Sequence, residues 1–144
     1  MEQQVFEQQI TMYVTRKADY AIRCVLYLSR HPERLASVEE ISGATYVPKS
    51  FLAKILQQLM KAGIVNSARG VKGGFQLAKK PKAVNLLEVI EAIQGPSAAN
   101  MCAVDKKLCR LSGTCSVHPV WVEIREMAEK RLREENFATL LKKK

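Results

Sequence analysis

TYVPKSFLAKILQQLMKAG, residues 45–63, is the part of the sequence from which we infer the fold class. Pro48 suits the first turn of a helix, because its missing N–H would have no intrahelical partner there. Apolar residues then recur at spacings of three and four, the pattern of a helix with one buried face; they are Phe51, Leu52, Ile55, Leu56, Leu59 and Met60. Gly63 supplies the stop. The sequence therefore predicts a helix from Pro48 to Gly63, entered through a tight turn at residues 45–47.

Two more helices are predicted upstream of this one. Thr15 is a suitable N-cap for an amphipathic helix over residues 16–30, which ends before Pro32. The sequence SVEE from Ser37 matches a capping box, in which the serine and a glutamate satisfy free amides of the first turn. That helix should run to about Ala44. Two helices joined by a tight turn and preceded by a third form a helix-turn-helix pattern.

A hairpin and a further helix follow downstream. Residues 64–67 and 75–77 are predicted as short strands, and the loop 69–74 between them contains glycines that can adopt the positive φ of a hairpin turn. Asn85 then caps a helix that reaches residue 94 and is closed by a glycine. We therefore expect a mostly α chain with a small β-wing, in which residues 12–95 form a winged helix-turn-helix domain.

Charge indicates the partner of this domain. The chain has 23 Lys and Arg against 14 Asp and Glu, a net charge of +9, which favours a polyanion. Residues 41–87 hold eight Lys or Arg and no Asp or Glu, so the positive charge coincides with the helix-turn-helix and the wing. A DNA-binding surface explains this coincidence better than an ordinary solvated basic face.

Six side chains are the predicted DNA contacts: Lys49, Ser50, Lys54, Gln57, Arg69 and Lys72. Ser50, Lys54 and Gln57 lie on or beside the helix side opposite the apolar residues, where they can reach base edges in a major groove. Arg69 opens the glycine-rich wing and suits a narrow, electronegative minor groove. For each of them, a phosphate contact or simple exposure is an equal alternative.

The cysteines form the second signal. No apolar run approaches the roughly 18 residues of a membrane span, and the first 11 residues lack the apolar stretch of a signal peptide. We therefore expect a cytoplasmic protein with no membrane partner, whose thiols stay reduced. The spacing Cys102-x6-Cys109-x5-Cys115-x2-His118 supplies thiolate and imidazole ligands that fit zinc or an iron-sulfur cluster. The gaps are wide for one zinc ion, which slightly favours a cluster. Cys24, among apolar neighbours, is expected in the core.

The remaining segments complete the predicted organisation. Residues 1–11 are expected to be a flexible extension, 96–118 a cysteine-containing loop, 119–136 a long helix and 137–144 a basic tail. The long helix carries an apolar stripe that favours a dimer seam over a core contact; it comprises Trp121, Ile124, Ala128 and Leu132. The chain lacks a glycine-rich phosphate loop and a carboxylate pair, so we do not expect an enzyme.

Over residues 12–135 the chain resembles the IscR/NsrR/CymR family of bacterial winged-helix regulators. The resemblance rests on MYVTRKADYA at residues 12–21, VPKSFL at 47–52, SARGVKGGF at 67–75, and the three-cysteine loop after them. It implies a homodimer built on the long C-terminal helix and double-stranded palindromic operator DNA as partner. It also implies a cluster on Cys102, Cys109 and Cys115 whose presence, oxidation or nitrosylation alters DNA affinity. Members similar to CymR lack these cysteines, which disfavours that branch.

The resemblance offers two candidates for the fourth ligand. His118 would correspond to a 2Fe-2S centre, whereas Asp19 matches the position used with 4Fe-4S centres in some NsrR-like nitric oxide sensors. We favour His118 and 2Fe-2S, because the loop can place this imidazole beside Cys115. The expected function is a dimeric repressor controlled by a cluster that senses iron-sulfur status, redox state or nitric oxide. The alternatives are a zinc-stabilised DNA-binding protein without sensing and a thiol-redox protein.

Overall fold

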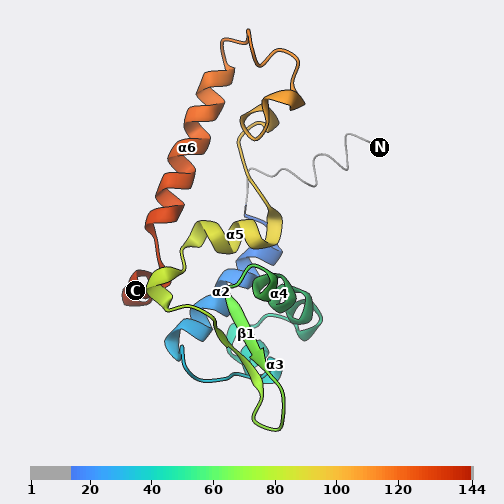
Figure 1. Ribbon diagram of the computed structural model, residues 1–144, viewed down its shortest axis with the longest axis vertical. Coiled ribbons are helices and arrows are strands. Elements are labelled where there is room, and N and C mark those ends of the chain that lie inside the picture. Colours follow the sequence, from blue (N-terminus) through green and yellow to red (C-terminus); the bar gives the residue numbers. More distant parts are fainter. Residues whose placement is uncertain (1–13, 144) are drawn as a thin grey trace.

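The computed structural model describes residues 14–143, so the predicted extension at residues 1–11 lies outside the described residues. The described chain is mostly helical with one two-stranded sheet, as predicted (Figure 1). In chain order its elements are α2 (Arg16–Arg30), α3 (Val38–Thr45), α4 (Lys49–Lys61), β1 (Val65–Ala68), β2 (Gly74–Leu77), the 3₁₀ helix η1 (Pro81–Ala83), α5 (Leu86–Gln94), the 3₁₀ helices η2 (Met101–Ala103) and η3 (Lys106–Leu108), α6 (His118–Glu134) and α7 (Phe137–Lys142).

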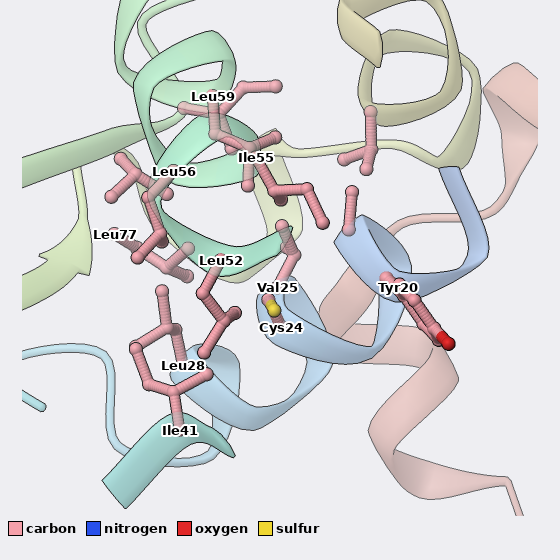
Figure 2. Close-up of a cluster of buried hydrophobic side chains, with 14 of the residues drawn as sticks. Tyr20, Cys24, Val25, Leu28, Ile41, Leu52, Ile55, Leu56, Leu59 and Leu77 are labelled. Atoms are coloured by element: carbon pink, nitrogen blue, oxygen red, sulfur yellow. The ribbon is translucent and has the colours of Figure 1, made fainter. Parts of the chain in front are cut away.

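The helix-turn-helix is built from α2, α3 and α4 around one apolar core. Thr15 caps α2 by accepting from the Ala18 amide, and Ser37 caps α3 by accepting from the Glu40 amide, each at 3.1 Å. Figure 2 shows where the apolar faces of these helices meet; the buried side chains there include Cys24, Val25, Leu28, Ile41, Leu52, Ile55, Leu56 and Leu59. Burial of this apolar face, more than helix propensity, fixes the orientation of α4.

The wing is the antiparallel pair β1 and β2, with Val65 opposite Leu77 and Ala68 opposite Gly74. Its second strand is bonded to the chain just before α3, because the Ala36 and Phe75 backbones exchange hydrogen bonds of 2.8 Å in both directions. A side chain at Gly74 would put its Cβ 2.5 Å from the Ala36 carbonyl oxygen, so this close approach requires glycine. The strands lie within one residue of their predicted positions.

Helix α5 lies between the helix-turn-helix and the C-terminal elements, packing against α2, α4 and α6. A capping box holds its first turn, with Asn85 and Glu88 bonded to each other's backbone amides. Helix α6 extends away from the body, and the segment that leaves α5 runs to its far end, where η2, η3 and the loop before His118 lie (Figure 1). It begins at His118, one residue before its predicted start, and ends at Glu134.

The predicted basic tail at residues 137–144 is wrong, because α7 occupies residues 137–142 and docks into the core. Phe137 is 0% exposed, and its amide donates to the Val84 carbonyl oxygen at 3.0 Å. The helix packs against α2 and η1. A six-residue helix is too short to show an apolar period. Phe137 is its one aromatic residue, and the three lysines at positions 142–144 made the segment resemble a solvated basic tail. Within residues 14–143, no helix has the length and apolarity needed to cross a membrane.

Candidate DNA interface and cysteine centre

The outer face of α4 presents the four residues that the sequence predicted for it. Leu52, Ile55, Leu56 and Leu59 face the core at 0% exposure, which turns the opposite side of the helix to solvent. Lys49, Ser50, Lys54 and Gln57 are all exposed there. Ser50, Lys54 and Gln57 are spaced by four and three, so they follow one line along the helix surface. A convex face of this kind has the dimensions to enter a major groove.

The two predicted wing contacts lie in the hairpin loop. Arg69 follows β1 directly, and Lys72 lies within the turn closed by the 2.9 Å bond from the Gly73 amide to the Gly70 carbonyl. Both side chains are exposed, and Val71 between them is fully exposed. A short loop that carries two cations beside the helix-turn-helix is suited to grip a nucleic acid backbone or a narrow groove.

Lys17 on α2 adds a cation that the sequence reasoning missed. Burial, and then the neighbouring Lys54 ammonium, lower the pKa of Lys17 below its ordinary value. Positive potential therefore extends from α4 onto the start of α2. The basic stretch recognised in the sequence began only at residue 41. No sequence pattern places Lys17 beside Lys54, which lies 37 positions further along the chain.

In the cysteine segment, the structure brings Cys102 and His118 together. Cys102 lies on η2 and His118 begins α6, and the Sγ and Nδ1 atoms are 3.2 Å apart. Each residue is 6% exposed. Two donors on one tetrahedral metal lie roughly 3.5 Å apart, given the usual metal–sulfur and metal–nitrogen bond lengths. The pair therefore has a separation that a shared metal tolerates.

The second ring nitrogen of His118 also points to a ligand site. His118 Nε2 is buried and has no hydrogen-bond partner among the described residues. A buried polar nitrogen without a partner loses its hydration with no compensation, which native proteins rarely tolerate without a functional reason. A soft thiol next to such an imidazole suits a transition metal.

The other candidate ligands are placed differently. Cys109 and Cys115 are partly exposed in the same segment, which is folded on itself by the Ser112 hydroxyl donating to the Lys106 and Cys109 carbonyls. Asp19 lies on α2 and pairs with Arg23 at 2.9 Å. Over residues 14–143, no three His, Cys, Asp or Glu side chains gather as a metal site would require. The structure thus joins Cys102 to His118 and leaves the remaining candidates apart from this pair.

Arg125 connects the cysteine segment to the long helix, and the sequence reasoning missed it. Its Nη1 atom donates to the Ala103 carbonyl at 2.8 Å, directly after Cys102. Its Nε atom is 2.7 Å from the Glu129 carboxylate, one turn further along α6. The guanidinium therefore holds η2 against α6 and fixes the position of the first cysteine.

Cys24 is a core residue, as the sequence predicted. It is 0% exposed, and burial raises the pKa of its thiol to about 12. The thiol stays protonated near neutral pH, which makes Cys24 a poor metal ligand and a poor nucleophile.

Three of the four residues of the predicted stripe on α6 border an apolar groove. Ile124, Ala128 and Leu132 line it from α6, and Ile90 lines it from α5; the enclosed volume is about 230 Å³. Ile124 is 42% exposed and Met127 63% exposed, while Trp121 is partly buried. The protruding helix thus keeps apolar surface in contact with solvent.

A winged helix-turn-helix with a basic outer face indicates a DNA-binding regulator, and the sequence comparison decides the family. The model of the Rrf2 family, described as an iron-dependent transcriptional regulator, matches residues 14–143. The chain belongs to the Rrf2 family.

Relatives of this Rrf2 protein agree with that assignment. It is 34% identical over 112 residues to an Aquifex aeolicus protein named as an HTH-type transcriptional regulator, covering 76% of this chain and 78% of the relative. It is 33% identical over 120 residues to a Rhodobacter capsulatus protein named as an Rrf2-like HTH-type regulator, covering 77% and 80% of the two chains.

Solved structures show the same fold. T. potens IscR has a TM-score of 0.73 at 24% identity, with 90% of this Rrf2 chain and 86% of IscR covered. CymR, the global cysteine regulator of B. subtilis, has a TM-score of 0.73 at 22% identity, with 91% and 97% covered. The predicted winged-helix fold and the resemblance to regulators of this kind are confirmed.

The Rrf2 assignment settles the class of activity. The chain is a DNA-binding transcriptional regulator, and the prediction that it is not an enzyme is confirmed by the family. Because two structural neighbours of equal TM-score carry the names IscR and CymR, the fold alone does not specify what an Rrf2 protein senses. That question depends on the side chains of the cysteine segment.

Proposed function

We propose that this Rrf2 protein is a dimeric repressor whose affinity for palindromic operator DNA is set by an iron-sulfur cluster. The observation that carries the proposal is the buried contact between Cys102 and His118, with His118 Nε2 left without a partner. The cluster would be held by Cys102, Cys109, Cys115 and His118. With His118 as the fourth ligand, we favour a 2Fe-2S cluster over a 4Fe-4S cluster. A bound cluster supplies a centre that changes charge or is lost in response to iron-sulfur status, oxidation or nitric oxide.

His118 is the better fourth ligand on the geometry of this chain. It already touches Cys102, whereas the Asp19 carboxylate is paired with Arg23 on a helix of the DNA-binding body. Cys109 and Cys115 lie in the segment between η3 and α6, so they can approach the pair without unfolding a long helix. Three cysteines and a histidine in one segment also support the proposal, because thiolate and imidazole are the ligands that iron-sulfur clusters use.

A physical route connects the cysteine segment to the DNA-binding helix. Arg125 bonds η2 to α6, α6 packs against α5, and α5 packs against both α2 and α4. A change in the segment that moves α6 on α5 therefore shifts the surface on which α4 rests. In a dimer the same movement alters the spacing of the two recognition helices, which must match half-sites about one DNA turn apart.

The metal assignment is tested by anaerobic purification of the full chain and of Cys→Ala variants at residues 102, 109 and 115. Brown protein with iron and acid-labile sulfide is expected for the wild type, and loss of both for each variant. Cys24→Ala is the matched control, because its thiol is buried away from the site. Colourless protein with stoichiometric zinc would instead establish the zinc-stabilised alternative. Colourless protein that contains neither iron nor zinc would contradict both metal sites and favour the thiol-redox alternative.

The fourth ligand is tested separately with His118→Ala and Asp19→Asn. We expect His118→Ala to lose the cluster or change its visible spectrum, while Asp19→Asn keeps both. The reverse result would establish Asp19 as the ligand and support a 4Fe-4S centre.

The DNA contacts are tested on a randomised duplex library at two salt concentrations. Lys54→Ala should relax the preference at one symmetric pair of positions, a loss of about 1–3 kcal/mol of discrimination. Arg69→Ala should lose most on duplexes with A·T-rich flanks, where the narrow minor groove attracts a guanidinium. If both variants weaken binding uniformly and lower the salt slope by about one, Lys54 and Arg69 contact phosphates only.

The dimer is tested by sedimentation at micromolar concentration. We propose that Trp121, Ile124 and Ala128 lie in a two-fold seam, because α6 exposes apolar surface along its length. Ile124→Asp should shift the wild-type dimer towards a 16.2 kDa monomer, whereas Glu126→Gln, exposed on the same helix, should not. A wild-type monomer would refute the seam.

A further inference from the structure

Among residues 14–143, Tyr46 combines an unusual backbone conformation with a highly exposed side chain. It links α3 to α4 with φ 59° and ψ 23°, in the left-handed region, and it is the single non-glycine residue with positive φ within residues 14–143. Its side chain is 86% exposed, although it is a large aromatic.

Both properties act against tyrosine at this position. A side chain with a Cβ is disfavoured in the left-handed region, where helices normally end with glycine or asparagine. An exposed ring also gains little from burial. A residue that is unfavourable in conformation and unburied in the free protein is a candidate for a function that needs it.

The turn holds Tyr46 firmly on both sides. Its amide donates to the Ser42 carbonyl at 3.0 Å, which closes the end of α3. The Ser42 hydroxyl donates to the Val47 carbonyl at 2.7 Å, and Val47 itself is 0% exposed. The backbone conformation is therefore imposed by the neighbours, and the ring projects from a rigid turn.

The position in the fold identifies the partner surface. In a helix-turn-helix, the first helix of the motif crosses the DNA backbone and the N-terminal residues of the second reach base edges. Tyr46 lies between these two helices, three residues before Lys49 at the start of α4. At that place the nearest part of a duplex is its phosphate backbone, and tyrosine hydroxyls are among the groups that donate to phosphate oxygens.

We propose that Tyr46 is a DNA-contacting residue whose hydroxyl donates to a backbone phosphate and so seats the N-terminus of α4 in the major groove. The inference rests on the DNA-binding mode proposed above. A phenol hydroxyl carries no cationic charge, so the contact strengthens binding without releasing a counterion. This distinguishes Tyr46 from the lysines around it.

The test compares Tyr46→Phe and Tyr46→Asn with the wild type, using duplexes selected from the randomised library. Tyr46→Phe keeps the ring and removes the hydroxyl, while Tyr46→Asn suits the left-handed backbone and removes the ring. Both should bind at least about tenfold more weakly, the lower end of the scale for a hydrogen bond to a charged group, with an unchanged salt slope. Tyr46→Asn should also melt roughly 2–5 °C higher, because the backbone strain is relieved.

The outcomes separate the inference from the proposed function. Lys49→Ala is the comparison, since loss of a phosphate-bound lysine lowers the salt slope by about one. If the wild type binds the selected duplexes and both Tyr46 variants bind them as tightly as the wild type does, the role of Tyr46 is refuted and the DNA-binding mode stands. Weaker binding by Tyr46→Asn alone would refute the hydroxyl contact. If the wild type binds no duplex, the proposed function fails first.

Discussion

Replacing Phe137 with alanine should destabilise the whole protein, although residue 137 lies close to the C-terminus. The ring is 0% exposed and belongs to the same apolar core as the helix-turn-helix. Removing a buried phenylalanine side chain usually costs roughly 3–5 kcal/mol, the sum of lost apolar transfer and of the cavity left behind. Because α7 is a helix of only six residues, it can relax into part of the cavity, so we expect about 3 kcal/mol.

The assay is urea unfolding of the full chain followed by circular dichroism, at one fixed protein concentration. Concentration must be held constant, because association stabilises the folded state by mass action. The expected loss is a large fraction of the roughly 5–15 kcal/mol that stabilises a typical domain. Thr139→Ala is the matched control, since Thr139 is exposed on the same helix and should change stability by less than about 0.5 kcal/mol.

If the free energy of unfolding of Phe137→Ala lies within about 0.5 kcal/mol of the wild-type value, the prediction is wrong, because removal of a fully buried ring should cost more stability than that. A loss equal to that of Thr139→Ala would likewise show that α7 does not contribute to the core.

Three further predictions concern the fold and the site. Hydrogen bonds from Tyr27 and Arg34 hold the pKa of the Glu40 carboxyl below its ordinary value. The ionised carboxylate therefore stabilises the folded protein above about pH 4.3, the ordinary pKa of a glutamate, and this stabilisation is lost as the pH falls through the lower pKa of the folded state. The stability difference between wild type and Glu40→Gln, measured in urea, should therefore shrink from pH 7 to about pH 3, and a constant difference would contradict this. Gly74→Ala should displace the wing and weaken DNA binding, whereas Gly43→Ala, which meets open space in α3, should keep binding and add roughly 0.5–1 kcal/mol of stability. Arg125→Met should release η2 from α6, so the iron-sulfur cluster proposed above should bleach with a chelator at least tenfold faster; an unchanged bleaching rate would exclude Arg125 as a positioning residue.

The helices whose signals are local could be predicted from the amino-acid sequence. The N-caps Thr15, Ser37 and Asn85 each accept a hydrogen bond from the amide three residues ahead. The residues that start α2, α3 and α5 therefore lie within one helical turn, where a sequence pattern can recognise them. The apolar period of α4 likewise predicted which side faces the core and therefore which residues remain outside. The basic charge over residues 41–87, which coincides with the helix-turn-helix and the wing, then indicated DNA as partner, and the family resemblance agreed with it.

Other features depend on contacts between residues far apart in the chain, and these emerged from the packing of the helices. Phe137 is buried because α2 and η1 provide its surroundings, Lys17 is affected by Lys54, and Cys102 meets His118 across 16 positions. The spacing of the cysteines and His118 predicted a shared site, but not that Cys102 rather than Cys115 contacts the imidazole. The other two contacts have no short pattern that encodes them, since each depends on how whole helices pack. Tyr46 illustrates the same limit at short range: its local preference disfavours a left-handed backbone, and the packing of α3 against α4 imposes one.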